Sequence, residues 1–144
     1  MMWAWQFAEM GGKMASFAVL AGKFLKRADG MDVEQQSEFF RGLGLCQLGG
    51  ARSAVPSIKK VGGANVRYAL KWSPVIVARD DGQKRGHTIV VTDHANDEYL
   101  IADPSAVQTI NFGKGAESDS NQGGFTSMGT GVFDRGLSGV IWYW

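Results

Sequence analysis

Two short apolar runs, residues 87–92 and 98–103, constrain the fold of this chain more than any other feature. Both are rich in β-branched residues, and the turn formers Asp93-His94-Ala95-Asn96-Asp97 separate them. This pattern predicts an antiparallel hairpin. A hairpin centred on Ala95 places His87 and Asp103 directly opposite each other, because both lie eight positions from its centre. We therefore expect their Cβ atoms on one face of the sheet, about 5 Å apart.

The face that carries this pair is otherwise apolar. Alternation along the two strands places four more side chains on it, namely Ile89, Val91, Tyr99 and Ile101. The pair should therefore lie at the edge of a core. A carboxylate there holds an imidazole in one tautomer and stabilises its protonated form, as a histidine that serves a nucleophile requires. The alternative is a purely structural histidine–aspartate pair.

Helical patterns come first along the chain. Apolar residues from Phe7 to Phe24 recur at alternating steps of three and four, which predicts an N-terminal helix. Asp32 with Gln35 resembles a capping box and should begin a second helix, which continues through Phe40. We expect Asn65 to cap a third helix at 66–72.

Strand patterns follow the helical ones. Besides the hairpin, strands are expected at 75–78, near 107–112 and at 140–144, whereas the region 42–57 should be irregular. The polar, glycine-rich stretch 113–131 is predicted to be a long loop. Helices first and antiparallel strands afterwards indicate a single α+β domain over residues 1–144.

Composition excludes several classes of function. The chain has 15 Lys and Arg against 14 Asp and Glu, a balance that argues against binding to nucleic acid or to a membrane surface. The longest apolar run, Met14–Leu25, is interrupted by Lys23 and is too short to span a bilayer. No secretory signal is recognised either.

The single thiol and the two imidazole side chains limit the chemistry further. A single cysteine, Cys46, excludes an internal disulfide, and its apolar surroundings predict a buried, inert thiol. The second histidine, His94, should be an exposed turn residue. One cysteine and two histidines form no metal-ligand pattern, so we expect neither a metal nor a cofactor.

The start of the chain gives these residues a context. Trp3-Ala4-Trp5 precedes the first predicted helix. With the Gly-His-Thr-Ile-Val-Val and Ile-Ala-Asp-Pro blocks, it resembles the papain-like cysteine peptidase superfamily, above all compact bacterial leader peptidases and effector or toxin proteases that carry Trp-Cys-Trp-Ala. Trp3 and Trp5 match the flanking tryptophans, and Ala4 stands where the catalytic cysteine should be. His87 matches the family histidine, and Asp103 matches the third residue.

The resemblance implies a papain-like fold, with an N-terminal helical half packed on an antiparallel sheet. It also implies thiolate attack on a protein or peptide substrate. We interpret Ala4 as a replaced cysteine in an enzyme inactivated on purpose, with a natural pseudoprotease as the alternative. Similarity to bacterial effectors further implies secretion or delivery into a target cell, action in its cytoplasm, and a cognate immunity protein as a partner.

Two further points stay open in the sequence. The same triad also serves leader peptidases, amidases, deamidases and transglutaminases, and a non-catalytic binding module would have Ala4 as its native residue. In the family, a glutamine shortly before the nucleophile donates a hydrogen bond to the oxyanion. Only Met1, Met2 and Trp3 precede Ala4, and Gln6 lies on the wrong side of it.

Overall fold

The computed structural model describes residues 19, 32–80, 86–103, 108–111, 117–120 and 124–144. The predicted N-terminal helix therefore lies outside the described residues, apart from the helical and exposed Val19. Positions 3–6 also lie outside them.

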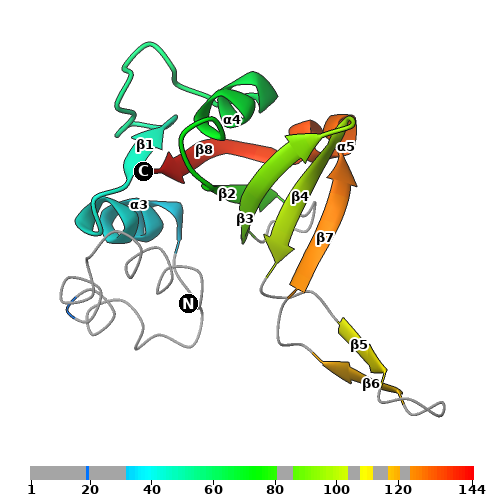
Figure 1. Cartoon of the computed structure of the whole chain (residues 1–144). Helices are drawn as coiled ribbons and strands as arrows, with labels where there is room; N and C mark the ends of the chain where they lie inside the picture. Colours follow the sequence, from blue (N-terminus) through cyan, green and yellow to red (C-terminus); the bar gives the residue numbers. More distant parts are fainter. Residues whose placement is uncertain (1–18, 20–31, 81–85, 104–107, 112–116, 121–123) are drawn as a thin grey trace.

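The centre of the structure is a six-stranded sheet in which every neighbouring pair is antiparallel. Its order is β1-β8-β2-β3-β4-β7. The strands are β1 (Cys46–Leu48), β2 (Val75–Asp80), β3 (Gly86–Ala95), β4 (Glu98–Asp103), β7 (Gly124–Gly129) and β8 (Leu137–Tyr143). A separate hairpin of β5 (Gln108–Asn111) and β6 (Glu117–Ser120) projects beyond the β4 and β7 end of this sheet (Figure 1).

Helices cover both faces of the sheet. On one face, α3 (Val33–Gly42) packs Phe39 and Phe40 into a core with Trp142 of β8. On the other face, α4 (Gly63–Ala69) and α5 (Thr130–Arg135) contribute Val66 and Phe133 to a second core. Helices together with an antiparallel sheet confirm the predicted α+β class.

Residues Ile89, Val91, Tyr99 and Ile101 are buried in this second core, beneath α4 and α5, as the alternation of the sequence predicted. The opposite face of the same strands is not solvent-facing throughout. Val90 and Ala102 are buried there in the core that contains α3. The middle of the sheet is therefore covered on both sides, and this part of the hairpin lies between two apolar layers.

The hairpin turns at a different place from the one predicted. Asn96 and Asp97 both have positive φ, 52° and 60°, and form a two-residue turn, which is the geometry preferred for a tight hairpin. The register also shifts once, because Val91 pairs with Ile101 but Asp93 pairs with Leu100. Thr92 is thus an extra residue in β3, a β-bulge. The predicted centre at Ala95 was wrong, because neither a tight turn nor a bulge shows in the hydrophobic pattern.

The other local predictions fared unevenly. The capping box of Asp32 and Gln35 is present at the start of α3, with Gln35 N 2.8 Å from Asp32 Oδ1. The third helix begins earlier than predicted: Gly62 is its N-cap, and Asn65 accepts a hydrogen bond from the Gly62 N–H instead of capping.

Two regions predicted to be irregular contain regular elements. The region 42–57 includes β1, and the predicted loop 113–131 includes β6, β7 and the start of α5. The strand β7 pairs only with β4 and is largely exposed. An exposed edge strand carries little of the apolar alternation by which strands are recognised, which is why the prediction failed there.

Candidate functional site

His87 and Asp103 are in contact. His87 is the second residue of β3, and Asp103 is the last residue of β4, so both lie at the end of the hairpin away from its turn. His87 Nε2 lies 2.7 Å from Asp103 Oδ1, with side-chain exposures of 35% and 24%. The pair is therefore partly shielded from water and yet accessible from outside.

The bulge at Thr92 explains why these two side chains share a face. Continuing the register of the strands places Asp103 level with Ile89, so it lies diagonally from His87 and not directly opposite. Diagonal neighbours on one face are still within reach of each other. If Thr92 paired in the ladder like its neighbours, the register set by the turn would continue, and the two side chains would point to opposite faces.

The contact fixes how the imidazole is used. An ionised carboxylate only accepts hydrogen bonds, so the neutral ring must carry its proton on Nε2 and donate it to Asp103. Nδ1 then holds the lone pair, and it has no hydrogen-bonding partner among the residues that the structure describes. The ring is oriented at one nitrogen and available as a base at the other.

Arg79 is a neighbour of this pair that the sequence analysis did not single out. It lies on β2 directly opposite His87. Burial lowers the pKa of Arg79, and the negative charge of Asp103 opposes that effect. The signal in the sequence is a single cation at the end of the apolar run Val75-Ile76-Val77-Ala78-Arg79, on the strand before the histidine.

A second polar cluster lies beneath α4 and α5. Arg67 Nη1 donates to Tyr99 Oη at 2.7 Å and to Asp134 Oδ2 at 3.2 Å, and Tyr99 Oη donates to Asp134 Oδ1 at 3.1 Å. Desolvation raises the pKa of Tyr99, and the nearby charge of Asp134 acts in the same direction. With its members all bonded to one another, this cluster connects α4, β4 and α5 and is structural.

His94 belongs to this structural cluster and is not an exposed turn residue. Its ring is half-buried, lies 4.4 Å from the Tyr99 ring between centroids, and has Nε2 2.8 Å from Thr130 Oγ1. Because the turn is shorter than predicted, His94 is part of β3 and points inwards.

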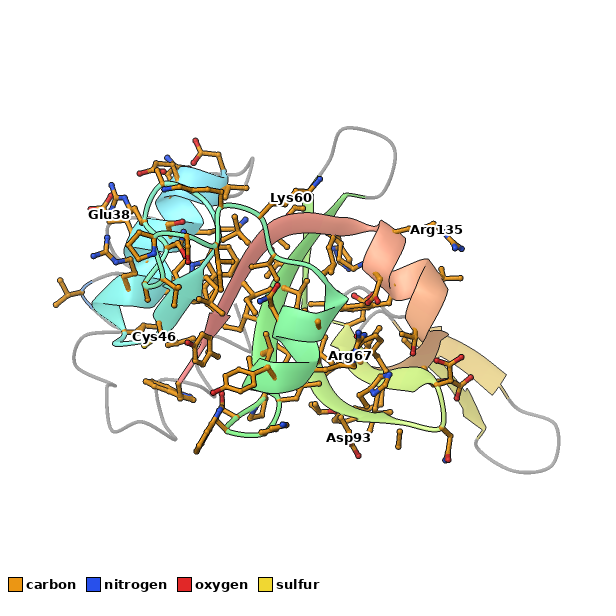
Figure 2. The ribbon with its side chains drawn as sticks, turned by 90° about the horizontal axis from the view of Figure 1, so that it is seen from above. Glu38, Cys46, Lys60, Arg67, Asp93 and Arg135 are labelled. Atoms are coloured by element: carbon orange, nitrogen blue, oxygen red, sulfur yellow. The ribbon has the colours of Figure 1, made fainter. Side chains whose placement is uncertain are left out.

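Cys46 is exposed, so the prediction of a buried thiol was wrong. It is the first residue of the three-residue strand β1, where alternation places it on the same face as Leu48 but at the end of the strand, outside the core. In the sheet, β8 and β2 separate β1 from β3, a separation of roughly 14 Å at the usual strand spacing. Figure 2 shows Cys46 beside α3, far from Arg135 on α5. Cys46 is therefore not placed to act with His87.

The remaining predicted site residue, Ala4, lies outside the described residues, as do the tryptophans that flank it. Within the described part of the chain, no group of three or more His, Cys, Asp or Glu side chains is arranged to hold a metal ion. None of the helices in that part is long and apolar enough to cross a membrane.

Comparison with known proteins identified no family for this chain. A scan against protein-family models and searches of the curated proteins and the solved structures found no match to the chain.

Proposed function

We propose that this chain is a papain-like cysteine peptidase domain of the bacterial effector or toxin type, with Ala4 at the position of the nucleophile. The observation that carries the proposal is the 2.7 Å contact between His87 Nε2 and Asp103 Oδ1, on a pair whose side chains remain partly accessible. The Trp3-Ala4-Trp5 motif supports it from the sequence.

The proposed chemistry is acyl transfer. With cysteine at position 4, the helix N-terminus expected there and an adjacent imidazolium would both favour the thiolate. The thiolate attacks the peptide carbonyl, and His87 gives its proton to the leaving amine as the thioester forms. A water molecule then loses a proton to His87 and hydrolyses the thioester, which restores the thiol enzyme. Asp103 orients the ring at Nε2 throughout.

The biological setting belongs to the same proposal. The substrate is a protein or peptide of a target cell into which the domain is delivered, and a cognate immunity protein protects the producing cell. No cofactor takes part. A leader peptidase, amidase, deamidase or transglutaminase would use the same three residues and differ in its products: a cut chain, released ammonia or a crosslink.

Ala4 itself favours one second candidate, a pseudoprotease that binds peptides without cutting them. A chain with alanine at this position has no nucleophile, whatever His87 and Asp103 do. The codon at position 4 in the encoding gene separates the two: a cysteine codon excludes the pseudoprotease.

The decisive experiment is labelling with an electrophilic thiol probe at neutral pH. The protein with Ala4→Cys is compared with the unchanged protein, both carrying Cys46→Ser, because the exposed Cys46 would otherwise react. We expect labelling at least ten times faster than that of an unactivated exposed thiol, because a larger thiolate fraction is the reactive form.

The matched control adds His87→Gln to the Ala4→Cys protein and should return the rate to that of an ordinary thiol. Labelling at the ordinary rate with His87 intact would overturn the proposal. Fast labelling that does not depend on His87 would overturn it too, since the histidine would then have no part in activating position 4.

A further inference from the structure

The side chain of Arg79 on β2 contacts β7 and α5. Its Nη1 lies 3.1 Å from Met128 Sδ on β7 and its Nη2 lies 3.4 Å from the carbonyl oxygen of Val132 on α5. In the sheet, β3 and β4 separate β2 from β7. A contact between residues so far apart in strand order requires the sheet to curl around the side that α5 closes.

The guanidinium is held by packing more than by hydrogen bonds. It lies 5.3 Å from the centroid of the Phe133 ring, a cation–π distance. A side chain at Gly136 would collide with it, so glycine there leaves it room. Its Nε is buried and has no hydrogen-bonding partner among the described residues. The carboxylate of Asp103 is the opposite charge that attracts it.

The charges facing His87 can be stated element by element for the described residues. β2 contributes Arg79, and β4 contributes Asp103. β7 contributes no titratable side chain. On α5, Asp134 is bonded to Arg67 and Tyr99, and Arg135 is exposed. Among the described residues, one cation and one anion therefore face the imidazole.

These two charges act on His87 in opposite directions. Asp103 alone would favour the imidazolium strongly, because an opposite charge at hydrogen-bonding distance stabilises the charged form. Arg79 compensates this in two ways: it balances the carboxylate, and it repels a second positive charge on the neighbouring strand. The two charges therefore oppose each other at the imidazole.

We propose that Arg79 is a positioning residue for this site, whose guanidinium offsets the charge of Asp103 beside the imidazole of His87. The inference rests on the proposed function for its meaning, since a base is needed only where a nucleophile is to be activated. Arg79 acts through Asp103 and His87 and does not itself contact the reacting groups.

The test is an NMR titration of the His87 ring protons in the protein as it stands, with Ala4. The two histidines are assigned with a His94→Gln variant. Arg79→Met should move the midpoint of the His87 titration upwards by about one pH unit. Arg79→Lys should restore most of the shift, because it returns the charge. Arg41→Met, which removes an exposed arginine from α3 on the opposite face, should leave the midpoint in place.

An unchanged midpoint in Arg79→Met, with the midpoint still sensitive to Asp103→Asn, would overturn the proposal and leave Arg79 a packing residue. If Arg79→Met does not fold, Arg79→Gln takes its place, with the same expected upward shift of the midpoint and the same contradicting result. Neither measurement depends on a nucleophile, whereas slow labelling of Ala4→Cys with Arg79 intact refutes the proposed function alone.

Discussion

At the scale of single residues, Tyr99 shows how a core position can hold a polar network. Its ring lies 4.1 Å from that of Phe133 between centroids and is fully buried, while its hydroxyl joins Arg67 to Asp134. Burial is the main cause that raises the pKa of this hydroxyl above its usual value near 10. The folded protein therefore favours the neutral phenol.

The Tyr99→Phe variant tests this. At neutral pH the variant should lose about 1 kcal/mol of unfolding free energy, because Arg67 and Asp134 keep their own bond. Above pH 10 the unfolded chain releases the phenolic proton before the folded protein does, so the parent loses stability as the pH rises towards the raised pKa. Urea denaturation from pH 8 to 11 should therefore show the gap between parent and variant closing. Parallel curves would contradict the assignment.

At the scale of elements, the bulge in β3 decides which residues meet. Asp93, His94 and Ala95 pair in the register set by the turn, whereas Val91 and Val90 pair one position out of it. The single extra residue, Thr92, carries this change. That His87 and Asp103 share a face thus depends on Thr92 bulging out of the ladder, although Thr92 belongs to no catalytic motif.

Two single-residue deletions in β3, one at the bulge and one outside it, test this dependence. Removing Thr92 makes the ladder continuous and should keep His87 beside Asp103. Removing Thr88 moves His87 by one position and should turn it towards α3, where Thr88 now bonds Gln36. Adding Asp103→Asn to each deletion variant reports whether the contact is present. It should shift the midpoint of the His87 titration in the first variant and leave it in place in the second. An equal response in both would refute the register argument.

The candidate site was predictable only in part from sequence. The β-branched runs give the two strands, and alternation gives the correct face for both His87 and Asp103. The predicted register was wrong by two positions, because the tight turn and the bulge each shift it. Because a register error of two positions leaves every side chain on its original face, the predicted face was still correct. Arg79 was missed because its role depends on the curl of the sheet, which no local pattern encodes.

At the scale of the whole molecule, two apolar layers share one sheet. Phe40 packs 5.0 Å from Trp142 between centroids on the α3 side, and Phe133 is buried on the side of α4 and α5. Alternate residues of β2 enter each layer: Ile76 one and Val77 the other. A strand shared in this way couples the two layers.

We therefore expect one cooperative unfolding transition that either layer can weaken. Phe40→Ala and Phe133→Ala should each lower the unfolding free energy by about 3–5 kcal/mol. Phe125→Ala, at a phenylalanine that is 65% exposed, should change it by less than about 0.5 kcal/mol. Far-UV circular dichroism and tryptophan fluorescence in urea should give coincident curves. Two separated transitions would show that the layers fold independently.

The place of β8 in the sheet has a consequence for how the protein is made. This strand lies between β1 and β2, yet it is translated after the other five strands. Until residues 137–143 leave the ribosome, β1 has no partner and one edge of β2 is open. Synthesis of the stretch 81–136 takes roughly 3 to 11 s at common elongation rates. For those seconds the unpaired backbone edge at Ile76 and Val77 is exposed to other nascent chains, so a chaperone that shields it should raise the yield of folded protein.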